Sequence, residues 1–169
     1  GKAAIIEAGR HITEKAGKNT VEMEEHHRHK EKGLLSSKTT TTYDEAKRTD
    51  TTGSIVEGDT LTMTAGKDIT LKGSAAVSTE KTTLLSGNNI SIDAAETENR
   101  EIHRKQVKKS GLFGSGLGFT IGSEKTKDSY DMEETTQTGS TAGSVKGNVT
   151  ITAGNETDIR ASDIIAGQD

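Results

Sequence analysis

The chain has 169 residues, of which 28% are hydrophobic, 28% are charged and 2% are aromatic, and its formal net charge is −4. The apolar share is far below the near half that is typical of globular domains, so the composition excludes a thick hydrophobic core. Cysteine is absent, which excludes disulfides, thiolate metal sites and cysteine nucleophiles. The acidic balance argues against nucleic-acid binding.

The N-terminal residues carry the first copy of a repeated pattern. Ala8 and Ile12 match Ala65 and Ile69 at an offset of 57 positions. The chain also contains 26 threonines, a residue type that favours strands. The few aliphatic residues alternate with polar ones, as they do in half-buried strands. The sequence therefore predicts short strands over residues 1–22.

The central stretch, residues 53–97, repeats with a period of about 21 residues. The matched pairs are Val56 and Val77, Leu61 and Thr82, Met63 and Leu84, Ile69 and Ile90, and Leu71 and Ile92. Gly66 and Gly87 recur at the same offset and mark tight corners. A short period with two-residue alternation predicts coils of three short strands, because one coil cannot bury its own apolar face and stacked coils can.

The C-terminal stretch, residues 143–169, repeats the central coil at an offset of 88, which places Val149 on Leu61. The predicted fold is therefore all-β, a right-handed parallel β-helix with about 21 residues per coil and a thin aliphatic interior. Coil sequence reaches both ends of the chain without a capping helix. We therefore expect one fragment of a longer solenoid, which stacks on neighbouring coils of its parent chain.

Two polar segments, residues 23–52 and 98–142, interrupt the coils and resemble each other. Tyr43-Asp44 recurs as Tyr130-Asp131 at an offset of 87, and both segments close with Thr-Gly-Ser. We expect two antiparallel β-arms that protrude from the helix. An isolated hairpin is only marginally stable, so each arm should lean on the stack or on the other arm.

Three stretches carry a family resemblance: residues 108–128 (KKSGLFGSGLGFTIGSEKTKD), 147–155 and 162–169. They resemble the haemagglutinin repeats of filamentous haemagglutinins, most of all the second repeat region of CdiA-type contact-dependent growth inhibition exoproteins. The resemblance implies a secreted Gram-negative surface protein that uses a two-partner-secretion transporter. It also implies a segment that associates with the target-cell outer membrane and helps a toxin to cross. The first arm departs from the pattern at Gly33-Leu34-Leu35, which replaces the long glycine-rich loop.

The glycine-rich loop, residues 111–122, is the main candidate site. It carries no charge and both phenylalanines, and its length suits a membrane β-strand. The candidate membrane-contact residues are Leu112, Phe113, Leu117, Phe119 and Ile121. The alternative is that these side chains form a small satellite core on the arm.

A basic run beside the loop offers candidate contacts with anionic head groups: His103, Arg104, Lys105, Lys108 and Lys109. Because acidic residues flank the run, ion pairing across strands of a solvated arm is the alternative. His26, His27 and His29 suggest zinc, but a strand places only two of them on one face, where structural zinc needs four ligands. We therefore expect no metal and no cofactor.

No residue pattern supports catalysis or nucleic-acid binding. Acids and bases are dispersed, and Gly114–Gly118 lacks the strand-to-helix context of a phosphate-binding loop. We therefore expect a non-catalytic repeat segment that acts in membrane association and toxin delivery. Two alternatives remain: an adhesin segment that binds host surfaces, and a passive stalk.

Overall fold

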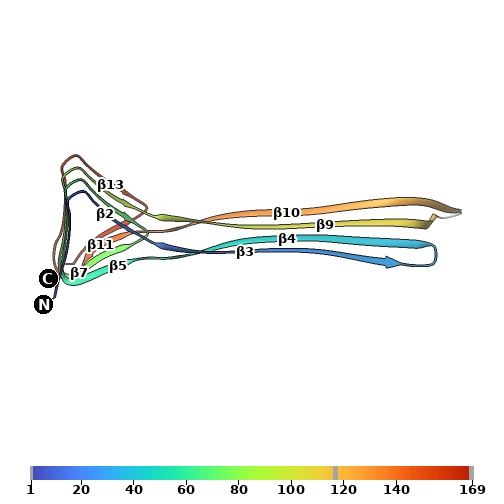
Figure 1. The fold of residues 1–169 in the computed structure, drawn as a ribbon, viewed down its shortest axis with the longest axis horizontal. Coiled ribbons are helices and arrows are strands. Elements are labelled where there is room, and N and C mark those ends of the chain that lie inside the picture. Colours follow the sequence, from blue (N-terminus) through green and yellow to red (C-terminus); the bar gives the residue numbers. More distant parts are fainter. Residues whose placement is uncertain (1, 116–117, 168–169) are drawn as a thin grey trace. The chain divides into compact units, whose positions relative to one another are not determined.

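The computed structural model describes residues 2–115 and 118–167, and every regular element in them is a β-strand (Figure 1). The prediction of an all-β chain is confirmed. The strands are β1 (Ala3–Ala8), β2 (His11–Lys15), β3 (Gly17–Lys32), β4 (Ser36–Thr52), β5 (Ile55–Ala65), β6 (Asp68–Lys72), β7 (Ala75–Ser86), β8 (Asn89–Asp93), β9 (Ala95–Ser115), β10 (Gly118–Thr138), β11 (Thr141–Ser144), β12 (Val149–Ala153), β13 (Glu156–Arg160) and β14 (Asp163–Ala166).

The chain divides into two compact units. The first consists of residues 1–19, 50–97 and 135–169, and the second consists of residues 20–49 and 98–134. The first unit holds two parallel sheets. Sheet A has the order β1-β5-β7-β11-β14, with β12 also paired to β7, and sheet B has the order β13-β8-β6-β2. Successive copies of the repeat therefore lie side by side, which is the arrangement of a β-helix-type repeat.

The strand register confirms the 21-residue offset at the matched aliphatic positions after the first pair. Met63 pairs with Leu84, and Ile69 pairs with Ile90. The offset of 88 is confirmed through β7, because Thr82 pairs with both Leu61 and Val149. These columns exist because each inward aliphatic side chain packs on the one in the next coil.

The offset of 57 is confirmed in the same way. Ala8 pairs with Ala65, and Ile12 pairs with Ile69. Residues 3–15 therefore form one more layer on the same stack, although 57 positions separate them from the layer that they contact.

One predicted match is wrong. Val56 pairs with Ala76 and not with Val77, because the register shifts between Gly58 and Thr60. In this stretch β7 has two residues, Thr79 and Glu80, where β5 has only Asp59. Before the shift the offset is therefore 20 residues, and after it the offset is 21.

The interior of the first unit is thin and aliphatic, as the composition predicts. Its largest fully buried apolar side chains come from the two central coils: Leu61, Met63, Ile69, Leu71, Leu84, Ile90 and Ile92. Each of these is 0% exposed. The small apolar share of the sequence is thus concentrated in a few columns, which is how a chain so poor in hydrophobic residues forms a core.

Both long polar segments leave and rejoin the coils at one corner. Ala16 N donates to Lys72 O at 2.8 Å, so the start of the first segment lies beside the turn between β6 and β7. Serines continue this corner from layer to layer. Ser74 N donates to Ser140 Oγ at 3.2 Å, and Ser140 N donates to Ser162 Oγ at 3.1 Å. Ser140 is the serine of the second Thr-Gly-Ser, so this motif joins the end of the second polar segment to the stacked coils.

The second unit consists of a single four-stranded sheet, sheet C, in the order β10-β9-β4-β3. The two polar segments, which the sequence predicts as two arms, are joined by antiparallel pairing of β4 with β9, from Ser36 opposite Gly111 to Lys47 opposite Arg100 (Figure 1). This pairing resolves the choice left open by the sequence, because each hairpin gains a partner from the other hairpin.

Candidate functional site

The two loops of sheet C meet at one end of the sheet. Gly33 N donates to Ser36 O at 2.7 Å and closes the turn between β3 and β4. Leu112 N, on β9, donates to Leu35 O of that turn at 3.2 Å. We call residues 33–37, 110–112 and 121 the sheet C end. It contains the short loop of the first segment and the base of the glycine-rich loop of the second.

The sheet C end exposes four aliphatic side chains to solvent. Leu34 is 101% exposed, Leu35 68%, Leu112 39% and Ile121 83%. Leu112 and Ile121 belong to the predicted loop, whereas Phe113, Leu117 and Phe119 lie outside the described side chains. Leu34 and Leu35 depart from the glycine-rich loop pattern, yet they bring two more exposed aliphatic side chains to the sheet C end. Two adjacent leucines between glycine and serine were the signal that could have identified them.

Gly111, on β9, packs closely against the turn between β3 and β4. Its φ is +149°, and a Cβ there would lie 2.5 Å from Leu35 O and 2.7 Å from Ser36 Cα. A side chain at this position must therefore push the two hairpins apart.

We expect Gly111→Ala to separate the loops at the sheet C end and to cost about 2 kcal/mol of unfolding free energy, because backbone atoms cannot move aside. Hydrogen exchange at the Leu112 amide should accelerate. Gly122→Ala is the matched control, since nothing lies within 4 Å of its Cβ position. Unchanged exchange in Gly111→Ala would mean that the turn accommodates the methyl group.

The five predicted head-group contacts do not form one patch. The register places Arg104 opposite Tyr43 and His103 opposite Asp44, and neighbouring residues of a strand point to opposite faces. His103, Lys105 and Lys109 therefore share one face, and Arg104 and Lys108 share the other. His103 Nδ1 forms a hydrogen bond and ion pair with Asp44 Oδ1.

The other half of sheet C is rich in ion pairs between strands. Lys47 Nζ lies 2.9 Å from Glu22 Oε1, and Arg100 Nη2 lies 3.2 Å from Asp131 Oδ2. The hydrogen bond from Lys47 to Glu22 raises the pKa of that lysine. Cross-strand ion pairs also include His103 with Asp44 in the basic run, and Lys38 Nζ lies 3.8 Å from Glu31 Oε2 next to the sheet C end.

The three histidines of β3 do not assemble a metal site. His27 Nε2 lies 3.5 Å from Glu25 Oε2, and His29 Nε2 lies 3.6 Å from Glu31 Oε1. Across residues 2–115 and 118–167, no three histidines or carboxylates gather closely enough to hold an ion. Likewise, no helix in these ranges could cross a membrane.

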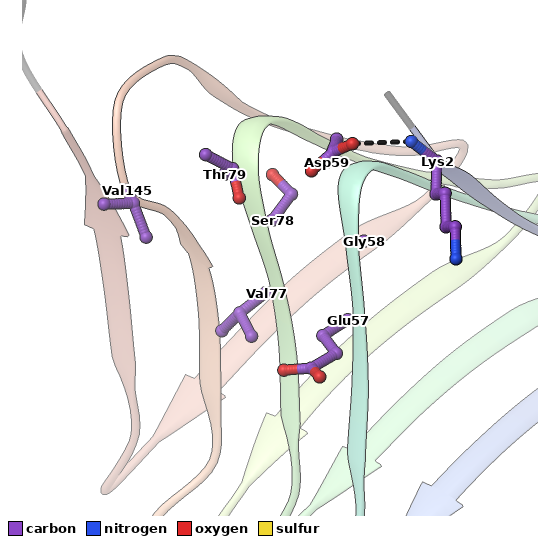
Figure 2. Close-up of a pocket in the computed structure, with 8 residues that line it drawn as sticks. All are labelled: Lys2, Glu57, Gly58, Asp59, Val77, Ser78, Thr79 and Val145. Carbon is purple, nitrogen blue, oxygen red and sulfur yellow. Dashed lines mark hydrogen bonds between the residues drawn. The ribbon is translucent and has the colours of Figure 1, made fainter.

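A shallow groove of about 460 Å³ lies on the first unit (Figure 2). Lys2, Glu57, Asp59, Val77 and Val145 line it, and the backbone amide of Lys2 donates to Asp59 Oδ2. Glu57 on β5 and Val77 on β7 are side by side in the strand register. The groove combines one cation, two carboxylates and small aliphatic side chains, without the aromatic platform on which a sugar ring would stack.

The comparisons with known proteins agree with the repeat pattern. The family model described as hemagglutinin repeat matches residues 33–169. The chain belongs to the hemagglutinin-repeat family. No solved structure matches it.

Named relatives share this hemagglutinin repeat. The chain is 42% identical over 140 residues to "tRNA nuclease CdiA" of Escherichia coli O6:K15:H31. It is 43% identical over 140 residues to "16S rRNA endonuclease CdiA" of Enterobacter cloacae. It is 32% identical over 142 residues to "tRNA nuclease CdiA-2" of Burkholderia pseudomallei. These matches cover 81–83% of this chain and only 4% of each relative. The chain thus corresponds to a repeat region within very large proteins.

Proposed function

We propose that this chain is a non-catalytic repeat segment of a large CdiA-like exoprotein, and that it contributes to outer-membrane association and toxin delivery into target bacteria. The parent protein would be exported by a two-partner-secretion transporter and displayed on a Gram-negative cell surface. In this proposal the first unit is a right-handed parallel β-helix that stacks on neighbouring coils of the parent chain. Sheet C, inserted at one of its corners, is the part that meets the membrane.

The observation that carries the proposal is the exposed aliphatic group at the sheet C end. Leu34, Leu35 and Ile121 are each more than half exposed, and they come from both insertions. Exposed apolar clusters on soluble surfaces mark contacts with proteins or membranes. The non-catalytic part is supported by the hemagglutinin-repeat match, which places the chain in a repeat region rather than in the portion for which the nuclease relatives are named.

The test is co-flotation of the purified chain with outer-membrane vesicles. We expect Leu35→Asp/Ile121→Asp to lower the vesicle-bound fraction at least tenfold, because each buried aliphatic side chain contributes about 1.5–3 kcal/mol. Ile5→Asp is the matched control, since Ile5 is 64% exposed but lies on β1 of the first unit.

Two results would contradict the proposal. If the unsubstituted chain does not float, the segment is a stalk, or an adhesin that binds a host surface. If Ile5→Asp lowers flotation as much as the paired substitution, the contact is not at the sheet C end.

A further inference from the structure

The half of sheet C next to the sheet C end has one strongly cationic face. Seven exposed basic side chains occupy it, and we call this set the basic face: Arg28, Lys30 and Lys32 on β3, Arg104 and Lys108 on β9, and Lys125 and Lys127 on β10. The positions between them on β4 and β9 are neutral, among them Thr39, Thr41 and Gln106. Among the described residues, the carboxylates of this face begin with Glu24 and Glu45, just beyond Tyr43.

Two contacts show which side chains of β3 and β9 lie on the same face of the sheet as those of β4. Lys47 and Glu22 form an ion pair, so the odd-numbered residues of β4 share a face with the even-numbered residues of β3. Tyr43 is directly opposite Arg104, so the same face carries the even-numbered residues of β9. Arg28 and Arg104 therefore lie on one side of the sheet, although 76 positions separate them in the sequence.

One ion pair adds β10 to this face. Arg100, on the same side of β9 as Arg104, forms an ion pair with Asp131, so odd-numbered residues of β10 point the same way. Lys125 and Lys127 therefore lie on the side of the sheet that carries Arg104.

Three lysines of the basic face, Lys108, Lys125 and Lys127, lie close enough to repel one another. The charge of Lys127 lowers the pKa of the Lys125 ammonium, and partial burial and the charge of Lys108 add to this effect. These three lysines on β9 and β10 therefore concentrate positive potential.

Few carboxylates approach this charge: Glu45 accepts a hydrogen bond from the Tyr43 hydroxyl at the edge of the basic face, beside Arg104. Lys47 and Arg100 have carboxylate partners in the other half of the sheet, and His103 has one on the opposite face. Among the described residues, by contrast, none of the seven basic-face residues forms an ion pair. Arg104 instead lies over the ring of Tyr43, with Cζ at 5.9 Å from the ring centroid. Like charges on neighbouring strands destabilise a sheet, so a bound anionic group would stabilise this face.

We propose that the basic face binds the phosphate groups of lipid head groups while the aliphatic residues of the sheet C end enter the apolar layer. This inference rests on the proposed function and names the chemistry that is recognised. Stable attachment to a membrane takes two signals, and an apolar element beside a polybasic patch supplies both. Single-stranded nucleic acid fits less well, because such sites stack bases on aromatic side chains, and Tyr43 is the one aromatic residue of this face in the described chain.

The experiment compares vesicles of phosphatidylcholine with vesicles of phosphatidylcholine and lipid A. We expect the full chain to bind the lipid A vesicles more tightly and to lose this preference as salt increases. Lys30→Gln/Lys127→Gln should weaken binding to lipid A vesicles about 30-fold, from the typical contribution of one basic residue near an anionic surface. The matched control is Lys105→Gln/Lys109→Gln, which removes the same charge from the opposite face of the same sheet.

Three results would overturn the inference. The first is equal weakening by both pairs, which would show a general charge effect. The second is salt-independent binding to both kinds of vesicle. The third is tighter binding of the full chain to single-stranded RNA than to lipid A vesicles, with loss of the RNA binding in Lys30→Gln/Lys127→Gln.

Failure of this inference is distinguishable from failure of the proposed function. If flotation with outer-membrane vesicles depends on Leu35 and Ile121 but not on the basic face, the proposed function stands and phosphate recognition does not. If the chain floats with no vesicle of any kind, both fail.

Discussion

Replacement of Glu14 by leucine is expected to stabilise the chain by at least about 3 kcal/mol at pH 8. Glu14 lies on β2 and is only 9% exposed, and neither of its carboxylate oxygens has a hydrogen-bond partner among the described residues. Its column continues through Leu71 and Ile92, both 0% exposed. An acid therefore occupies a position that the fold fills with aliphatic side chains in the next two coils, and leucine would complete the column.

The same residue predicts how stability depends on pH. Desolvation by burial raises the pKa of Glu14 from 4.5 to about 7. Between these values the unfolded chain has lost a proton that the folded chain still holds. The stability is thus fully present below pH 4.5 and falls as pH rises toward 7, by about 3 kcal/mol in total. Above pH 7 this contribution is constant.

The measurement is urea unfolding of the unsubstituted chain and of Glu14→Leu at several pH values from 4.5 to 8. The difference between the two proteins should grow across this range, and taking the difference removes the titration of the five histidines. Glu7→Leu is the control, because Glu7 is an exposed acid on the neighbouring strand β1. A difference that is constant with pH would show that the Glu14 carboxylate is solvated.

Glu14 also shows what limits prediction from this sequence. The columns of Met63 with Leu84 and of Ile69 with Ile90 were predictable, because both members are aliphatic and recur at one offset. Glu14 was missed, since a charged residue in a period-two pattern looks like an outward position. Val77 was misplaced because the extra residue in β7 lies between outward polar side chains, where no aliphatic match reveals it.

The pairing of β4 with β9 was beyond sequence reasoning for a different reason. Residues 36–47 are mostly threonine and charged residues, and a strand without an apolar face has a weakly specified register. Without that register, the run from His103 to Lys109 looks like one basic patch. With it, Arg104 joins Arg28 and Lys127, which come from other parts of the chain, while His103 turns to Asp44 on the opposite face.

Gly87→Ala is expected to destabilise the chain by about 3 kcal/mol, because a glycine column at one corner of the coils has no space for side chains. A Cβ at Gly87 would lie 2.3 Å from Gly66 O, in the coil beside it. Hydrogen bonds hold both sides of that carbonyl: Gly87 N donates to Ala65 O at 2.9 Å, and Asn88 N donates to Lys67 O at 2.8 Å. The carbonyl cannot turn away without breaking one of these bonds, so the cost is at the upper end of the range for overpacking.

The stacking explanation is tested by a second glycine of the same column. Gly9 precedes β2 as Gly66 precedes β6, yet nothing lies within 4 Å of its Cβ position. Gly9→Ala should therefore leave the urea midpoint nearly unchanged or raise it slightly, since alanine restricts the unfolded chain. If both alanine substitutions cost the same free energy, backbone conformation rather than close contact between coils would explain the glycines of this column. If only Gly87→Ala is costly, the close spacing between coils is what requires glycine at this corner.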